Sequence, residues 1–213
     1  MSASATPQSA GEAAILDAAV HLFSVHGYDG VSMRRIAEAA GVSKANIYHH
    51  FASKEALYFA IMRRSAAELT QLLESLAEGK GAFNQRLQAF AAGHLEHLFE
   101  NAERVRLVLR EAFSGDEEKT RAVVEQMVGG IVHRMIAIFA AGQQAGLLRP
   151  ELDPGLCAHL LMGADLFYFQ AHGLLQQIPE AGFARDPGRY SKQMVDVLLN
   201  GMLAGGAEGR RAP

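Results

Sequence analysis

Apolar side chains recur at helical spacing along nearly the whole chain. Ile15, Ala19 and Leu22 begin the first stripe, and the stripes within residues 83–98 and 124–139 advance by similar steps. Steps of three and four residues place side chains on one face of a helix. No segment alternates strictly between apolar and polar residues, as a half-buried strand would. The pattern predicts an all-α fold.

Residues 31–54 contain the signals for several short helices. Ser32 is placed to cap a helix that Gly41 ends, because glycine adopts the left-handed conformation at low cost. Ser43 is placed to cap a second short helix, and Ser53 to begin a longer one. The spacing therefore predicts two short helices joined by a tight turn, with a longer helix behind them.

Two later helices are predicted to begin with an aspartate followed by a proline. Asp153 and Asp186 each combine an acidic N-cap with a proline at the first helical position. The apolar stripe of the last helix is predicted to comprise Tyr190, Met194, Val197, Leu198 and Gly201.

The local distribution of charge is more informative than the net charge of −3. Between Ser32 and Lys54 the chain has four basic residues and one acidic residue, Glu38. A small basic patch on a mildly acidic protein favours a surface that approaches phosphates with one face. A second charged cluster is interpreted as a solvated helix face. It comprises Arg104, Arg106, Arg110 and Glu111.

Cysteine content and hydropathy indicate a cytoplasmic protein. The single cysteine, Cys157, excludes an intramolecular disulfide and a thiol-rich metal site. The densest apolar stretch, residues 156–175, is interrupted by polar side chains, so no membrane span is expected. The N-terminal residues lack the basic start and apolar run of a signal peptide. We expect no membrane association, no metal and no cofactor.

Residues 31–51 have the pattern of a helix-turn-helix, whose second helix enters the major groove of DNA. If Ile47, His50 and Phe51 pack inward, the residues between them point outward. The outward set is Lys44, Ala45, Asn46, Tyr48 and His49. The pattern therefore predicts an exposed polar ridge at residues 44–49.

The side chains of this ridge are suited to contacts with DNA. Asn46 can pair with adenine N6 and N7, and Ala45 is small enough to meet a thymine methyl group. Lys44, Tyr48 and His49 can reach phosphates, which position a helix without reading the sequence.

Residues that flank the ridge are suited to further phosphate contacts. Ser32 and Ser43 lie at predicted helix N-termini, where free backbone N–H groups attract phosphate oxygens. Lys54, in the first turn of the following helix, can hold the DNA backbone on the far side.

The stretch from Gly41 to Phe51, with Ser53, Lys54 and Glu55 behind it, resembles the DNA-binding domain of the TetR family of repressors. The resemblance is specific over residues 15–57. Beyond residue 57 it rests only on the length of the chain and the number of predicted helices. It implies a three-helix DNA-binding head, a connecting fourth helix and a larger helical body. In this family the body pairs through its last two helices and usually encloses an inducer pocket.

The resemblance also implies which residues touch DNA and where the domains begin and end. Asn46 stands where the family often has a small hydroxyl residue or glycine, so the operator sequence is not implied. We expect a disordered tail at 1–10, a DNA-binding domain at 11–57, a ligand-binding and dimerisation domain at 58–205 and a second tail at 206–213. The predicted DNA-contacting residues are Ser32, Arg34, Ser43, Lys44, Ala45, Asn46, Tyr48, His49 and Lys54.

The body contains two polar residues on apolar helix faces. His94 is interpreted as a hydrogen-bonded core histidine, with contact to a ligand as the alternative. A metal shared with His97 is disfavoured because no cysteine or carboxylate cluster accompanies the pair. Asp165 needs a partner when buried, and we expect His172 or an arginine. Its alternative role is a polar anchor in the wall of a pocket.

The expected pocket combines these residues with nearby aromatic and methionine side chains, although such stripes are more often plain core. The candidate set is Phe90, His94, Met127, Met135, Asp165, Tyr168, Phe169 and His172.

We expect a homodimer that binds double-stranded DNA at a palindromic operator. We expect a small-molecule effector to release it from this operator. One alternative is a DNA-binding protein whose body binds a protein partner. An enclosed cavity would favour the effector, and an exposed apolar patch the partner. A helical enzyme is the third hypothesis, and no catalytic motif supports it.

Overall fold

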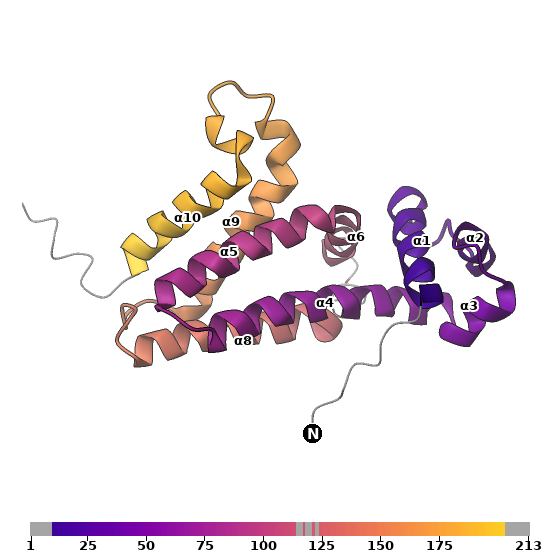
Figure 1. The fold of residues 1–213 in the computed structure, drawn as a ribbon, viewed down its shortest axis with the longest axis horizontal. Coiled ribbons are helices and arrows are strands. Elements are labelled where there is room, and N and C mark those ends of the chain that lie inside the picture. The colour runs from indigo at the N-terminus through magenta and orange to yellow at the C-terminus, as the bar shows by residue number, and fades with distance from the viewer. Residues whose placement is uncertain (1–9, 114–116, 118–120, 122–123, 203–213) are drawn as a thin grey trace, which may run out of the picture. The chain divides into compact units, whose positions relative to one another are not determined.

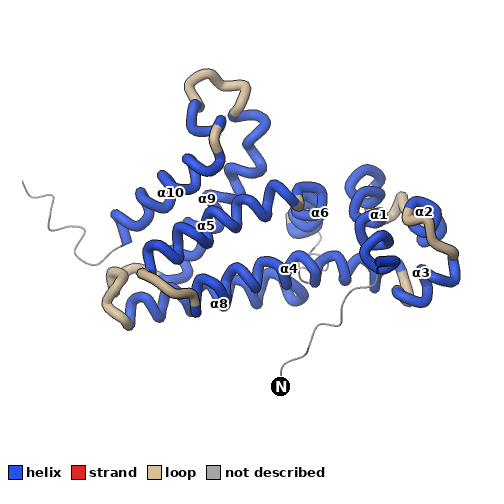
Figure 2. Tube along the Cα trace, in the orientation of Figure 1, coloured by secondary structure: helices blue, strands red, loops and turns tan. Residues whose placement is uncertain are grey.

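Every regular element in the described part of the chain is a helix, as Figure 2 shows. The computed structural model describes residues 10–113, 117, 121 and 124–202. The all-α prediction is confirmed. The second predicted tail, and all of the first except Ala10, lie outside the described residues.

Short connections join most of the described helices (Figure 1). In chain order they are α1 (Ala10–His26), α2 (Met33–Ala39), α3 (Lys44–His50), α4 (Lys54–Glu78), α5 (Phe83–Glu100), α6 (Ala102–Ala112), a π-helical turn η1 (Val124–Val128), α8 (Gly129–Gln144), α9 (Pro154–Leu175), a 3-10 turn η2 (Gly182–Arg185) and α10 (Pro187–Met202).

The chain divides into two compact units. The first comprises the described residues of Met1–Ala66 and Ala102–Met127, and the second those of Ala67–Asn101 and Val128–Pro213. Helix α4 contributes residues to both units. The domain boundary expected after residue 57 stays a prediction, but the first unit continues into α4 and includes α6.

The core of the first unit is built from the inward faces of α1, α2, α3 and the start of α4. Phe23, Ile36, Ile47 and Leu57 have no exposed surface. Leu107 of α6 joins the same cluster. A helix of seven residues such as α2 or α3 is marginal alone, so this shared core is what stabilises both.

The turn between α2 and α3 has the geometry that the sequence predicts. Gly41 has φ +68°, in the left-handed region. The Val42 N–H donates to the Ala37 carbonyl at 3.0 Å, which closes the end of α2. The Ser43 hydroxyl accepts from the Asn46 N–H at 3.1 Å and caps α3. The turn is therefore fixed by one glycine and one cap.

The second unit packs α5, α8, α9 and α10 around one another. Asp153 accepts from the Leu156 N–H at 2.9 Å, and Asp186 accepts from the Arg189 N–H at 2.9 Å. Both predicted aspartate caps are confirmed.

The buried face of α10 differs from the predicted stripe. Ser191, Val195 and Leu199 are buried, whereas Val197 is 71% exposed. The predicted stripe was wrong because α10 has apolar residues on more than one side. Only its packing against α5 and α9 decides which side is buried.

Replacing Gly41 with alanine should destabilise the protein by about 1–2 kcal/mol, because a Cβ disfavours the left-handed conformation. No atom obstructs a Cβ at this position, so the cost is conformational. Urea unfolding measures the difference. Gly11→Ala is the control, because Gly11 lies in α1 without a positive φ and should gain up to about 1 kcal/mol. Equal effects of the two substitutions would contradict this account of the turn.

Candidate functional site

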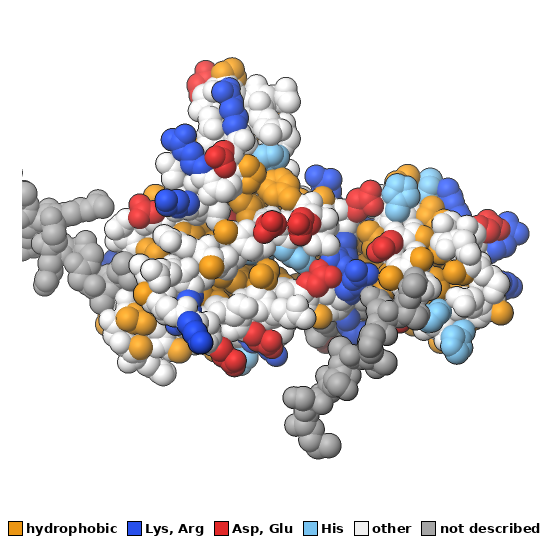
Figure 3. Space-filling view, viewed as in Figure 1, with side chains coloured by type: hydrophobic (Ala, Val, Ile, Leu, Met, Phe, Trp, Pro, Cys, Tyr) orange, Lys and Arg blue, Asp and Glu red, His pale blue; other side chains and the backbone are white. Residues whose placement is uncertain are grey.

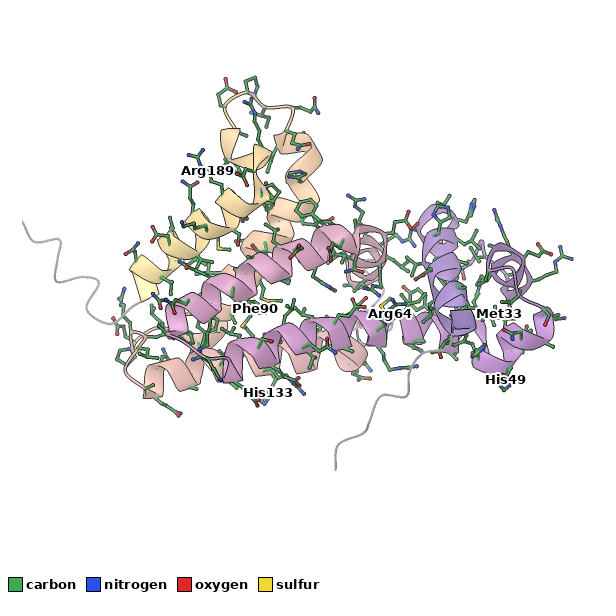
Figure 4. All side chains as sticks on the ribbon, viewed as in Figure 1. Met33, His49, Arg64, Phe90, His133 and Arg189 are labelled. Carbon is green, nitrogen blue, oxygen red and sulfur yellow. The ribbon has the colours of Figure 1, made fainter. Side chains whose placement is uncertain are left out.

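Helix α3 exposes the polar ridge that the sequence predicts. Lys44, Ala45, Asn46, Tyr48 and His49 are all exposed. Ile47 is fully buried, Phe51 is 6% exposed, and His50 is half-buried. Figure 4 shows His49 on the outer side of α3, pointing away from α1 and α2. The predicted facing is confirmed, because Ile47 anchors the helix in the core of the first unit.

The two serine caps hold the N-termini of both short helices. The Ser32 hydroxyl accepts from the Arg35 N–H at 3.3 Å, as Ser43 does from Asn46. Each hydroxyl acts here as the acceptor, so its own O–H group can still donate to a phosphate oxygen.

The basic residues of the first unit differ in how strongly their side chains interact with other protein groups. Arg34 is largely exposed and lies 3.5 Å from Glu38, an i, i+4 pair that contributes little in solvent. Arg35 donates to His26 Nε2 at 2.8 Å. Figure 3 shows Lys and Arg side chains over α2 and the start of α3. The predicted basic patch is therefore on the surface, with Arg34, Arg35 and Lys44 exposed and Lys54 half-buried.

Lys54 is engaged within the protein. Its ammonium donates to the Tyr28 carbonyl at 2.8 Å and lies 4.1 Å from the centroid of the Tyr28 ring. Burial, then Glu55 and Asp29, raise the pKa of the Tyr28 phenol, which stays neutral. The phosphate contact expected of Lys54 stays a prediction, and it would compete with this internal contact.

Helix α6 is held against the end of α1 by Arg110. The Arg110 guanidinium donates to the Phe23 carbonyl at 2.9 Å and to the Ser24 carbonyl at 3.4 Å. Arg104 in the same helix is buried. The interpretation of this cluster as a solvated face was wrong for Arg104, whereas Arg110 is exposed. Helix α6 packs against α1 within the first unit, which spacing alone does not reveal.

A buried hydrogen bond between His94 and Asp165 joins α5 and α9 in the second unit. His94 Nδ1 lies 2.9 Å from Asp165 Oδ2, and the two side chains are 3% and 0% exposed. Burial raises the pKa of the Asp165 carboxyl, and the hydrogen bond with His94 opposes part of that rise. The Phe90 ring stacks on the His94 ring at 5.7 Å. His94 is thus a hydrogen-bonded core histidine, as predicted.

The partner expected for Asp165 was wrong. His172 shares a face of α9 with Asp165, but the packing of α5 against α9 places His94 opposite the carboxylate. Asp165 Oδ1 and His172 Nδ1 are buried and have no hydrogen-bond partner among the residues that the structure describes. Sequence spacing within α9 could not identify a partner that comes from α5.

An aromatic cluster forms along α9, around the residues that follow Asp165. Phe99 contacts Tyr168, Phe169 and His172 with ring centroids 4.8–6.2 Å apart. Tyr168 also stacks on Tyr190 of α10 at 3.9 Å. Sequence reasoning missed Phe99 and Tyr190 as members of this cluster, because they reach Tyr168 from other helices.

Both tyrosine hydroxyls in the cluster are engaged. Tyr168 donates to the Ala184 carbonyl at 3.2 Å, and Tyr190 donates to the Ala164 carbonyl at 2.7 Å. Burial, followed by the charge of Asp165 and by Tyr168, raises the pKa of the Tyr190 phenol well above its ordinary value. Both hydroxyls therefore tie α9 to the segments that follow it, since Tyr168 reaches η2 and Tyr190 joins α10 to α9.

The structure brings most of the candidate pocket residues together. Phe90 contacts His94 on α5, and Tyr168, Phe169 and His172 cluster along α9. Met135 of α8 is buried. The Met127 side chain lies outside the described residues. Their role as a ligand pocket stays a prediction.

The described part of the chain contains neither a metal site nor a membrane-spanning helix. Within it, no group of three or more His, Cys, Asp and Glu side chains could hold a metal ion. None of the described helices combines the length and apolar character needed to cross a bilayer.

Two family models match this chain. Residues 15–61 match the model of bacterial regulatory proteins, tetR family, and residues 84–197 match the tetracyclin repressor-like C-terminal domain. The two matches include the α3 ridge and the His94–Asp165 pair.

Individual relatives resemble the N-terminal part. The chain is 42% identical over 59 residues to the HTH-type transcriptional repressor AcnR of Corynebacterium glutamicum, covering 28% of this chain and 31% of that protein. It is 52% identical over 56 residues to the HTH-type transcriptional regulator RutR of Escherichia coli K12, or 26% of each chain. These matches therefore span less than a third of each relative.

Among solved structures, the chain is similar to SmeT in complex with triclosan, with a TM-score of 0.72. The sequence identity is 23%, over 93% of this chain and 94% of that one. At this identity the likeness shows the fold.

Replacing His94 alone with leucine should cost about 3 kcal/mol, because the Asp165 carboxylate would stay buried without its partner. Replacing both residues with leucine should restore most of that loss. Chemical unfolding of wild type, His94→Leu, Asp165→Leu and the double variant measures the coupling. Additive losses from the two single changes would show that the pair is not energetically coupled.

Proposed function

Because this chain belongs to the tetR family of bacterial regulatory proteins, we propose that it is a repressor that binds a palindromic operator as a homodimer and is released by a small molecule. Such a regulator acts in the cytoplasm, where it meets the chromosome. The observation that carries the proposal is the exposed polar ridge of α3, held by the buried Ile47 and the Ser43 cap.

The residues of the ridge divide into two that contact base edges and three that contact phosphates. Asn46, in the first turn of α3, pairs with adenine, and Ala45 meets a neighbouring thymine methyl group. Lys44, Tyr48 and His49 contact phosphates on either side. The flanking phosphate contacts come from four further residues, Ser32, Arg34, Ser43 and Lys54.

The dimer forms through α9 and α10. Helix α9 has a second apolar stripe, opposite the face that buries Asp165, and this stripe is exposed. It comprises Leu156, Leu160, Phe167 and Leu174. An exposed apolar stripe of this length is typical of a protein interface. Val197 on α10 is exposed as well. Two copies joined this way present two α3 helices to major grooves about 34–36 Å apart.

The effector binds beside the His94–Asp165 pair. Asp165 Oδ1 and His172 Nδ1 lack partners in an aromatic surrounding, which suits a small molecule with a few polar groups. SmeT, which has the same fold, has been solved with triclosan. An effector that weakens operator binding must itself bind more weakly to the operator complex by the same factor. Helix α4, which contributes to both units, is the coupling element.

A protein partner in place of the small molecule is the second candidate. Exposed apolar side chains at the connection between α9 and α10 favour it, namely Ile178 and Phe183. Titration of small molecules into the free and the operator-bound protein separates the two, because only a small-molecule site binds them and shows the reciprocal change in their affinity.

Replacing Asn46 with alanine should relax discrimination at one base pair of each half-site by about 1–3 kcal/mol. Binding to a set of duplexes with single base changes measures this loss. His49→Ala is the matched control, because removal of a phosphate contact weakens all duplexes alike. If Asn46→Ala kept the wild-type order of preference, the assignment of Asn46 as a base reader would be wrong.

Replacing Phe167 with glutamate should convert the dimer into a monomer, because it places a charge in the centre of the exposed α9 stripe. Sedimentation velocity measures the mass, and operator affinity should fall with it. Val132→Glu is the control, since Val132 is an exposed apolar residue on α8. A Phe167→Glu protein that remained a dimer would exclude this interface.

A further inference from the structure

The aromatic cluster along α9 extends from the core of the second unit to its surface. Tyr168 lies at the inner side of the cluster and is 1% exposed. The members that reach solvent are Phe99, His172, Phe183 and Tyr190, of which Phe183 is the most exposed. Figure 3 shows hydrophobic side chains and a histidine together at the surface between α9 and α5. A ligand can therefore approach this cluster from solvent.

The two tyrosines of the cluster have no hydroxyl group to spare for a ligand. Tyr168 donates to the Ala184 carbonyl, and Tyr190 donates to the Ala164 carbonyl. Phe183 lies beside both rings, with centroids 6.4 Å from Tyr168 and 6.3 Å from Tyr190. What the cluster offers is therefore mainly aromatic surface. The face of an aromatic ring is its negative side and attracts cations.

Asp165 adds an unused hydrogen-bond acceptor next to these rings. Its Oδ2 lies 2.9 Å from His94 Nδ1, whereas Oδ1 has no partner among the described residues. The Tyr190 hydroxyl reaches Ala164, the residue before Asp165, and the charge of Asp165 contributes to raising the pKa of the Tyr190 phenol. The carboxyl group therefore lies close to the cluster. A buried acceptor without a donor costs free energy, and a donor on a ligand removes that cost.

The charges that act on the cluster are negative. After burial, Asp165 raises the pKa of the Tyr190 phenol most, and Asp186 raises the pKa of the Tyr168 phenol. An anionic ligand would bring a further negative charge to this partly buried place, where like charges repel strongly. A positively charged ligand has the opposite effect, because it compensates the carboxylate and is attracted by the ring faces.

We propose that the site beside Asp165 takes an aromatic organic cation. Its protonated amine donates to Asp165 Oδ1, and its rings lie against Phe99, Tyr168 and Tyr190. The inference rests on the proposed function, whose effector it assigns to a chemical class. It also explains why a carboxylate with one unbonded oxygen stands beside half-buried rings and not in an apolar core.

Three probes with the same biphenyl frame and different head groups test the charge of the ligand. They are biphenylmethylamine, which is a cation at neutral pH, the neutral biphenylmethanol and the anionic biphenylcarboxylate. Isothermal titration calorimetry with the full chain measures the affinity of each probe. The same probes are then added to the protein bound to a duplex that the wild type selects from a random pool.

Two variants show whether Asp165 causes the preference. Asp165→Asn removes the charge and keeps an oxygen that can accept from His94. Asp196→Asn is the matched control, because Asp196 is an exposed carboxylate on α10. The thermal midpoint of each variant shows that it is folded at the temperature of the titration.

The amine should bind wild type at least about tenfold more tightly than the alcohol, as expected of a hydrogen bond between charged groups. The carboxylate should bind most weakly. Asp165→Asn should abolish the preference for the amine over the alcohol, and Asp196→Asn should keep it. If Asp165→Asn does not fold, Phe99→Leu removes a half-buried ring and should weaken binding of the amine about threefold.

Three results would overturn the cation site. They are no binding of the amine to wild type at millimolar concentration, an alcohol or carboxylate that binds as tightly as the amine, and a preference that survives in Asp165→Asn. An unchanged affinity for the amine in Phe99→Leu is also contrary. Release from DNA is judged separately. An amine that binds as expected but leaves the duplex bound supports the site and contradicts the effector role in the proposed function. A wild type that selects no duplex contradicts DNA binding itself.

Discussion

The burial of Ile47 is the interaction on which the exposed polar ridge of α3 depends. Helix α3 has seven residues, too few to persist alone in water. Ile47 inserts into the core of the first unit with no exposed surface, and Ser43 caps the N-terminus. With one side fixed in this way, residues 44–49 must present their remaining side chains to solvent as one rigid ridge.

The first unit adds contacts that hold this ridge in place from behind. Arg110 of α6 donates to the last carbonyls of α1, and Lys54 of α4 donates to the turn that precedes α2. Both contacts involve a charged donor and a backbone carbonyl, so they fix the backbone itself. Helix α4 also contributes to the second unit. A conformational change in the second unit can therefore be transmitted along α4 to the DNA-binding surface. The His94–Asp165 pair gives that unit a polar centre whose second carboxylate oxygen is unpaired.

The features that the sequence predicted correctly are those that local chemistry decides. A glycine with positive φ, a serine cap and a helical period are properties of a few neighbouring residues, so the turn at Gly41 and the facing of α3 could be predicted. The partner of Asp165 could not, because it depends on which face of α5 packs against α9. The predicted apolar stripe of α10 was wrong for a related reason. Val197 is apolar yet exposed, because the neighbouring helices decide which face of α10 is buried. Lys54 was selected by its position, but its contact with Tyr28 appears only when the chain is folded.

The most direct test of the account is hydroxyl-radical footprinting of the full-length protein on the duplex that it selects. Two copies of the α3 ridge predict two protected windows on the DNA backbone, related by a twofold axis and separated by about one helical turn of 10–10.5 base pairs. A single protected window, or protection without that symmetry, would contradict the claim that two ridges engage one duplex together.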